Sequence, residues 1–293
     1  MEIENQEKFY EQYHLEDDFE DVFWDLGCRH GRKVIFDFIE VKEGKVLDVG
    51  AGLGILLSEL NSSLEKYALE CSSSTVKLGK DRFKDLKWSI ADAQNMPYKD
   101  NFFDLVVSCH SLEHITNDKK VIDEIFRILK NEGQLILYLP SNSRGILKEV
   151  YRKKNRHLRA YTKEMVINLL GDRFKIEKCV YPARFLSSFW WIFRNILIFK
   201  NTIIKMMRKK ANFIYYFRRF VLRKNINDNL LKNYDKYQYC HTSWYRKFVL
   251  PILEFIIFPI DSFFGKLRFN LVGFMNGYDQ SICISARKIS AGN

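Results

Sequence analysis

KVLDVGAGLG, the stretch from Lys45 to Gly54, decides the fold of this chain. It predicts an apolar strand that breaks into three glycines at alternate positions, followed by a helix that begins near Leu53. Glycine has no Cβ, so the main chain can turn tightly and lie against a ligand, while the N-terminus of the next helix attracts anionic groups. The stretch therefore predicts a turn that binds a nucleotide cofactor.

The spacing of these glycines argues against a dinucleotide. The dinucleotide pattern G-x-G-x-x-G requires glycine at its sixth position, where this chain has Ile55. NAD is therefore disfavoured, and the turn alone still allows an ordinary strand-to-helix loop. The neighbouring strands decide between these readings.

Acidic residues follow the next two predicted strands. The strand Tyr67-Ala68-Leu69 ends at Glu70, whose carboxylate can accept two hydrogen bonds from the hydroxyls of a ribose. A third strand, Trp88 to Ala93, contains Asp92, which can accept from an adenine amino group. Further strands are predicted at 103–109 and 133–139, with helical stretches between them, so the fold class is α/β.

Four motifs in this order resemble the class I S-adenosylmethionine (SAM) dependent methyltransferases, especially the type 11 group. They are VLDVGAGLG, Glu70, ADAQNMPYKDNFFDLVVSCHSLEHI and LKNEGQLILYLP, and the resemblance covers about residues 40 to 182 plus a final strand. It implies a Rossmann-like sheet of seven strands. One departure is Asn131-Glu132-Gly133, which replaces the usual Pro-Gly-Gly turn and does not touch the cofactor contacts.

The resemblance also implies SAM as the cofactor and a set of residues that bind it. Asp48 and the glycines would border the methionine part, Glu70 would hold the ribose, and Asp92 with Ala93 would meet the adenine. The full predicted set is Asp48, Gly50, Ala51, Gly52, Gly54, Glu70, Asp92, Ala93 and Ser108.

With 293 residues, the chain is longer than a methyltransferase core requires. We expect an N-terminal helical cap at 1–40, the SAM-binding core at 41–182, a largely helical insertion at 183–272, and a final strand and tail at 273–293. The insertion separates strands predicted at 174–181 and 280–287, which class I topology makes consecutive and antiparallel. Because ligands bind at the carboxyl ends of strands in open α/β sheets, the insertion should lie over the active-site face.

One segment of the insertion, Arg184 to Lys224, accounts for the whole net charge of +11, because it contains eleven Lys or Arg and no Asp or Glu. Residues 185–208 predict an amphipathic helix with a basic face and aromatic borders, which suits a membrane surface. We therefore expect reversible docking on anionic lipid, without crossing the bilayer. Two alternatives remain: a lid that packs on the core, and RNA binding by the aromatic and arginine run 213–220, with nucleic acid the less favoured partner.

The N-terminus and the cysteines indicate the compartment. Residues 1–21 are acidic and lack the apolar region of a secretory signal. The six cysteines lie far apart without a C-x-x-C pair, which predicts neither disulfides nor a zinc site. The sequence thus favours a cytoplasmic protein, peripheral at the inner face of the cell membrane, with no metal; it leaves the oligomeric state open.

Three residues are candidates for catalysis: His110, His157 and Tyr161. Methyl transfer mainly requires orientation, and the Asn-Pro-Pro-Tyr motif associated with nitrogen methylation is absent after the strand 103–109, so we expect an oxygen or carbon acceptor. His110 follows that strand directly and can act as a base. The segment from His157 to Tyr161 resembles one that borders the acceptor side in the same family, before the helix Lys163–Leu170 with Thr162 as its N-cap. Capping and loop packing explain His157 and Tyr161 equally well. The pair Glu113-His114 also occurs in the family that the chain resembles, which implies a mostly structural role for His114.

The sequence therefore predicts a SAM-dependent methyltransferase that acts on a lipid or lipid-linked acceptor at the membrane surface. The first alternative is a soluble methyltransferase for a small molecule or glycan, with the insertion as a lid. The second is a SAM-binding membrane or RNA-binding module without turnover.

Overall fold

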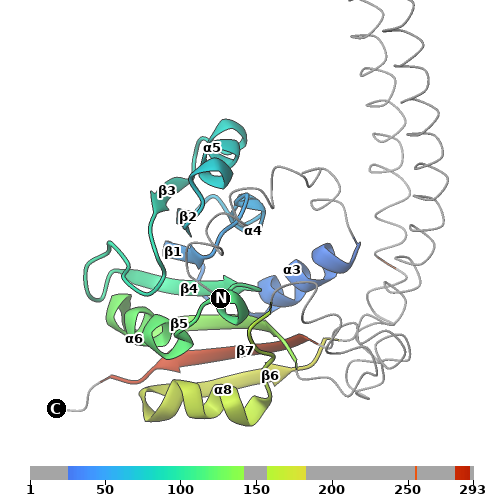
Figure 1. The fold of residues 1–293 in the computed structure, drawn as a ribbon, viewed down its shortest axis with the longest axis vertical. Helices are drawn as coiled ribbons and strands as arrows, with labels where there is room; N and C mark the ends of the chain where they lie inside the picture. The colour runs from blue at the N-terminus through green and yellow to red at the C-terminus, as the bar shows by residue number, and fades with distance from the viewer. Residues whose placement is uncertain (1–25, 142–156, 183–254, 256–280, 291–293) are drawn as a thin grey trace, which may run out of the picture. The chain divides into compact units, whose positions relative to one another are not determined.

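The computed structural model describes residues 26–141, 157–182, 255 and 281–290. They form a seven-stranded sheet in the order β3-β2-β1-β4-β5-β7-β6 (Figure 1). The strands are β1 (Gly44–Val49), β2 (Leu64–Glu70), β3 (Lys87–Ile90), β4 (Phe103–Cys109), β5 (Leu129–Pro140), β6 (Phe174–Val180) and β7 (Ser281–Lys288). The first five are parallel, whereas β7 pairs antiparallel with both β5 and β6. The predicted Rossmann-like α/β sheet is confirmed.

The buried parts of the central strands are largely apolar because both faces of the sheet are covered. Side chains alternate between the faces, so each strand contributes to two cores. One core contains Leu47, Val106 and Leu137. The other contains residues adjacent to these on the same strands, such as Val46, Leu105 and Ile136.

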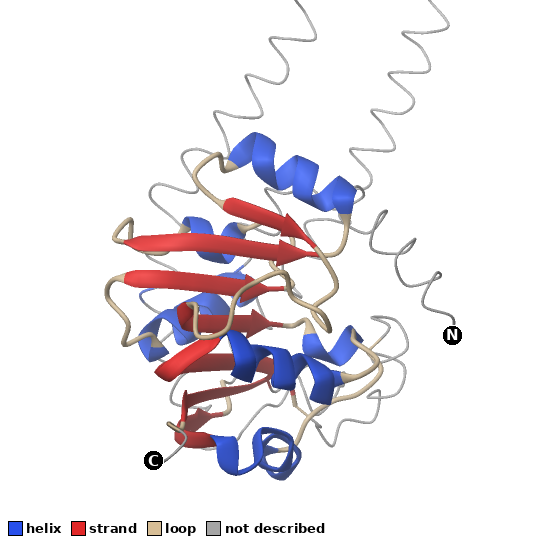
Figure 2. Cartoon of the chain, turned by 90° about the vertical axis from the view of Figure 1, so that its left-hand side faces the viewer, coloured by secondary structure: helices blue, strands red, loops and turns tan. Residues whose placement is uncertain are grey.

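Helices cover the two faces in different ways. Helices α6 (Asp118–Ile128) and α8 (Lys163–Leu170) add their apolar side chains to the first core, whereas α3 (Leu26–Phe38) and the short α4 (Ile55–Ser58) add theirs to the second. Helix α5 (Ser73–Arg82) packs beside β2 and β3. Figure 2 shows helices on both sides of the strands. Both faces are therefore occupied, which leaves the strand ends for ligands.

Several predicted boundaries are close to the observed ones, and the differences have local causes. Helix α4, predicted to begin near Leu53, begins at Ile55, because Gly54 adopts the left-handed conformation with φ 79°. Strand β3 ends at Ile90 rather than Ala93, because the Asp92 carboxylate accepts from the amide of Gln94 and turns the chain. Helix α8 has the predicted bounds, and its Thr162 hydroxyl accepts from the amide of Met165 as an N-cap.

Much of the predicted cap and insertion lies outside the described residues, namely 1–25, 183–254 and 256–272. The described elements all belong to one of two units of the chain, the one with residues 1–185 and 261–293. No helix among the described residues is long and apolar enough to span a membrane. The boundaries, the amphipathic helix and the membrane docking stay predictions.

Candidate active site

The candidate site lies where the strand order reverses, between β1 and β4. The chain runs from β1 outward to β2 and β3, and from β4 outward to β5 on the other side. Open α/β sheets bind ligands at such a switch point, at the carboxyl ends of the strands. Two segments meet there, which we name the glycine bend (residues 50–54, after β1) and the histidine turn (residues 110–114, after β4).

The glycine bend is held by its neighbours. The amides of Gly50 and Ala51 both donate to the carbonyl of Leu69, at 2.9 and 3.0 Å, which ties the bend to the end of β2. Gly50 has φ 76°, and a Cβ there would lie 2.4 Å from the Cβ of Ser111. A Cβ on Gly54 would similarly lie 2.9 Å from an indole carbon of Trp88. These two glycines are therefore required by packing within the protein, and not only by the approach of a ligand.

Glu70, the predicted ribose residue, supports the same bend from the end of β2. Its buried carboxylate accepts from the amides of Gly52 at 2.9 Å, Cys71 at 2.9 Å and Ser72 at 3.1 Å. A carboxylate has about four acceptor positions. The Cys71 thiol, a weak donor at 3.3 Å, shares Oε1 with the amides of Cys71 and Ser72. Oε2 accepts from Gly52 alone in the described residues, so it has an acceptor position for a ribose hydroxyl, and the geometry is compatible with the predicted contact.

Asp48 lies in β1, directly before the bend, and is 2% exposed. Its Oδ1 has no hydrogen-bond partner among the residues that the structure describes. Burial, and then the charge of Glu70, raise the pKa of Asp48 to about 7. No lysine or arginine of the described segments forms an ion pair with Asp48 or Glu70. A bound cation would therefore relieve the electrostatic strain at this edge.

The other predicted cofactor residues differ in exposure. Asp92 is exposed and accepts from the backbone and side-chain amides of Gln94, whereas Ala93 is buried. Ser108 is fully buried, and its hydroxyl donates to the carbonyl of Val49 at 3.3 Å. Ser108 thus supports the bend from within the sheet, while the contacts of Asp92 and Ala93 with an adenine stay predictions.

His110 begins the histidine turn in a conformation that is uncommon for a residue with a side chain. Its φ is 51°, and its amide donates to the carbonyl of Tyr138 at 2.9 Å. Such a conformation costs roughly 1–3 kcal/mol and occurs often at functional sites. The His110 Nδ1 lies 3.1 Å from Oε1 of Glu113. The backbone therefore aims this imidazole at a buried carboxylate.

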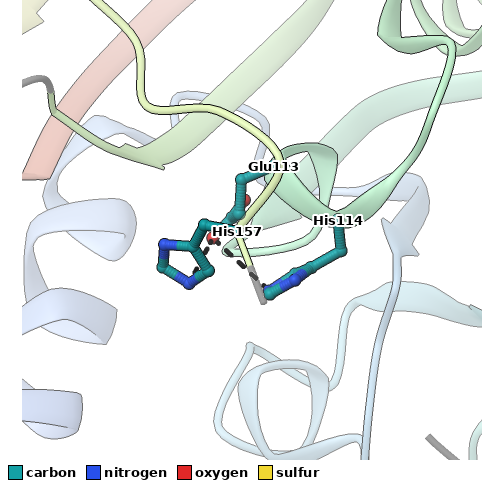
Figure 3. Close-up of side chains that lie close together, drawn as sticks. All are labelled: Glu113, His114 and His157. Atoms are coloured by element: carbon teal, nitrogen blue, oxygen red, sulfur yellow. Dashed lines mark ion pairs between the residues drawn. The ribbon is translucent and has the colours of Figure 1, made fainter. Parts of the chain in front are cut away.

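Glu113 is the centre of the turn, with a side chain that is 0% exposed. Its Oε1 lies 3.8 Å from Nε2 of His114 and 3.9 Å from Nε2 of His157 (Figure 3). Burial alone would raise the pKa of Glu113, but His110, His114 and His157 outweigh it, so this pKa lies below its usual value. The amide of Leu158 donates to the Glu113 carbonyl at 2.8 Å and joins the two segments.

Tyr161 has a different environment from the two histidines predicted beside it. It is 1% exposed, and its hydroxyl donates to Oδ2 of Asp118 at 3.0 Å. Burial, and then the charge of Asp118, raise the pKa of Tyr161. The structure thus gathers His110 and His157 around Glu113 and binds Tyr161 to Asp118. The sequence analysis did not identify Glu113 as the residue that the histidines surround. Glu113 lies three positions after His110 and one before His114, and this closeness could have indicated it.

Comparison with known proteins agrees with this arrangement. Residues 47–137 match the family model of a methyltransferase domain, a range that contains the glycine bend, Glu70 and the histidine turn. Residues 47–137 form a class I SAM-dependent methyltransferase domain. The methyltransferase domain therefore places its family motifs at the switch point of the sheet.

Curated relatives match this methyltransferase domain over part of their length. Demethylmenaquinone methyltransferase from Thermotoga maritima is 30% identical over 125 residues, which is 41% of this chain and 55% of that protein. A ubiquinone/menaquinone biosynthesis C-methyltransferase from Laribacter hongkongensis is 33% identical over 115 residues, 36% of this chain and 47% of that protein. The chain spans about half the length of the curated relatives it matches.

One solved structure is similar to this chain in fold. A Bacillus halodurans protein described as a methyltransferase is 19% identical with a TM-score of 0.51, and the match covers 89% of this chain and 99% of that one. At this identity the likeness shows the fold alone.

The residues of the methyltransferase domain fit SAM, the cofactor of its class. SAM carries positive charge on its sulfonium and ammonium groups. Asp48 has an unpartnered buried oxygen, and neither it nor Glu70 has a cationic partner in the described part of the chain. A cationic cofactor supplies the charge that this edge lacks.

Proposed function

We propose that this chain is a SAM-dependent methyltransferase that binds its cofactor against the glycine bend, Asp48 and Glu70, and methylates an oxygen or carbon acceptor. One observation carries the proposal: two electrostatically coupled carboxylates lie at the switch point without a cationic partner in the described segments. The matched domain and the named methyltransferase relatives support it.

The chemistry requires mainly orientation from the protein. When bound, SAM supplies a methyl group that is already activated on a positively charged sulfur. Orientation of two reactants can contribute roughly 7–11 kcal/mol to lowering the barrier. Asp48 and Glu70 attract a positively charged donor more strongly than a neutral product, so they favour binding before transfer and release after it.

His110 is the side chain that the geometry favours as a base. Its side chain is 30% exposed, and Nδ1 lies 3.1 Å from Glu113. Donation from Nδ1 to this carboxylate leaves Nε2 as the acceptor, because a neutral imidazole has one donor and one acceptor nitrogen. Nε2 can then take a proton from an acceptor hydroxyl or an acidic carbon. Glu113 acts by orienting the ring.

The acceptor is proposed to be a lipid or lipid-linked compound, met by a cytoplasmic enzyme at the inner face of the membrane. All the excess positive charge lies between Arg184 and Lys224, which supports this proposal. Anionic lipid attracts basic residues near its surface, and each contributes about 1 kcal/mol to the binding free energy. The quinone-related names of the curated relatives are consistent with an apolar acceptor.

Cofactor binding is tested by calorimetric titration with SAM. Glu70→Gln removes the charge while nearly preserving shape, and we expect SAM affinity to fall ten- to hundredfold, as for a charge-assisted hydrogen bond of about 1.5–3 kcal/mol. Asp85→Asn, the same change at an exposed carboxylate, is the matched control and should bind like wild type. Equal affinity in Glu70→Gln and wild type would overturn the assignment of Glu70.

The acceptor class is tested with radiolabelled SAM and a cell extract separated into lipid, RNA and polar fractions. The proposal expects label in the lipid fraction. Label in the polar fraction alone would favour a small molecule or glycan, label in RNA would favour nucleic acid, and no label with intact SAM binding would indicate a module without turnover.

Membrane docking is tested by flotation with anionic liposomes. Replacing Lys205, Arg208, Lys209 and Lys210 by glutamine should release the protein, and added salt should release wild type as well. Liposomes of neutral lipid are the control, and equal retention on both kinds refutes electrostatic docking.

A further inference from the structure

The side chains of Glu113, His114 and His157 form a cluster. The proposed methyl transfer uses Glu113 to orient His110 but assigns no role to the cluster as a whole. One ligand-type atom from each residue lies within 4.8 Å of the others (Figure 3). We propose that Glu113, His114 and His157 bind a divalent transition-metal ion. The cysteine spacing predicts no metal site, and this cluster arises instead from two segments that the fold brings together.

The distances suit an ion after a small contraction. Nitrogen and oxygen ligands lie about 2.0–2.2 Å from zinc, so neighbouring ligand atoms are roughly 3.3 Å apart in a tetrahedral site. Glu113 Oε1 is 3.8 Å from Nε2 of His114 and 3.9 Å from Nε2 of His157. The two imidazole rings meet edge to face at 4.8 Å between centroids. The three ligand atoms all lie within 4.8 Å of one another, so side-chain rotations that move them by about 1 Å bring them to coordination distance.

The burial of Glu113 is the second, independent observation. Its side chain is 0% exposed, and Oε2 has no hydrogen-bond partner among the described residues. A buried carboxylate oxygen without a partner is costly, and in native proteins it calls for an explanation such as an ion. His157 is also nearly buried, with a side chain that is 9% exposed. A cation that binds both oxygens of this carboxylate, between Glu113 and the two histidines, would give Oε2 the partner it lacks in the described part of the chain, where water has little access.

The donor set indicates which ions fit. Two imidazoles and one carboxylate suit Zn²⁺, Fe²⁺, Co²⁺ or Mn²⁺, whereas Ca²⁺ and Mg²⁺ prefer oxygen ligands. His110, with Nδ1 3.1 Å from Oε1 of Glu113, then orients the carboxylate as an outer partner. Three protein ligands leave coordination positions open. That an oxygen of the methyl acceptor takes one of them rests on the proposed function, whereas the metal site itself does not.

The test is a Co²⁺ titration of the full-length protein after chelation, followed by visible absorption. We expect saturation at one equivalent, with bands of a low-coordinate nitrogen and oxygen site that Zn²⁺ abolishes by competition. His114→Ala and His157→Ala should each weaken Co²⁺ binding at least tenfold. Asp85→Asn, at an exposed carboxylate, should bind Co²⁺ like wild type. Saturable binding that survives unchanged in both histidine variants overturns the proposal, as does the absence of a saturable signal in wild type.

A second measurement needs no variant, so a folding defect cannot confuse it. X-ray absorption of Zn²⁺-loaded wild type should show nitrogen and oxygen neighbours with imidazole scattering, and a sulfur shell would instead place the ion on cysteines and overturn the proposal. SAM titration of the same metal-free and metal-loaded samples separates the two proposals. Normal SAM binding without metal binding sinks this inference alone, and metal binding without SAM binding sinks only the proposed function.

Discussion

Two buried carboxylates at the same edge of the sheet have pKa values that shift in opposite directions. Asp48, before the glycine bend, has its pKa raised to about 7 by burial and by the charge of Glu70. Glu113, in the histidine turn, has its pKa lowered, because three imidazoles outweigh the effect of burial. The difference teaches that burial alone does not decide ionisation; the neighbours do.

The two regions are therefore prepared for different partners. Asp48 and Glu70, which flank the glycine bend, form no ion pair with a lysine or arginine of the described residues, which suits a positively charged cofactor. The histidine turn already surrounds its carboxylate with imidazoles, which suits proton transfer or a metal ion. The predictions below test this contrast.

The largest expected effect is the pH dependence of Asp48. Its pKa is higher in the folded state than the ordinary 3.8, so the folded state binds the extra proton and loses relative stability as pH rises from about 4 to 7. We therefore expect Asp48→Asn to become more stable relative to wild type as pH rises across this window. The difference in the free energy of unfolding should grow by up to about 4 kcal/mol, since each unit of pKa shift corresponds to about 1.4 kcal/mol. Denaturant unfolding at a series of pH values measures it. A flat difference would show that Asp48 titrates normally, and saturating SAM should reduce the difference.

The next effect is Gly50→Ala, which tests how the two regions contact one another. The new Cβ would meet Ser111 at 2.4 Å in a backbone with φ 76°, so we expect a loss of roughly 2–4 kcal/mol of stability together with weaker SAM binding. In a Ser111→Gly background the clash is gone, and the same substitution should cost only the backbone term of about 1–2 kcal/mol. Equal costs in both backgrounds would mean that Ser111 does not constrain the bend.

Glu113→Gln should destabilise the protein by about 1.5–3 kcal/mol at pH 7, because it removes the charged partner of His110. Measured with chelator present, this change has the opposite sign to that of Asp48→Asn at the same pH. The exposed Asp85→Asn should stay within about 0.5 kcal/mol of wild type. If both buried variants shift in the same direction, the contrast between the two regions is wrong.

The smallest effect is expected for Tyr161→Phe. It removes the hydroxyl that donates to Asp118 and should cost about 1 kcal/mol of stability, while kcat changes less than about twofold. Tyr67→Phe, which loses a hydroxyl bound to Glu65 in β2, is the matched control. A loss of kcat of two orders of magnitude in Tyr161→Phe with unchanged stability would restore Tyr161 as a catalytic residue.

The sequence by itself determined the sheet, the glycine bend, the place of Glu70 at the end of β2 and the Thr162 cap of α8. Each of these depends on residue types within a few positions, through strand periodicity, glycine conformation or a local hydrogen bond. The proposed amphipathic insertion has the same kind of local basis, and it stays a prediction because its residues lie outside those described.

Only the tertiary structure decided how the chemical groups are paired. The packing of Ser111 against Gly50, the meeting of His157 with Glu113 and the bond from Tyr161 to Asp118 all join segments that are apart in the sequence. The ionisation of Asp48 and Glu113 follows from the same distances, because charges interact through space and burial is a property of the whole fold.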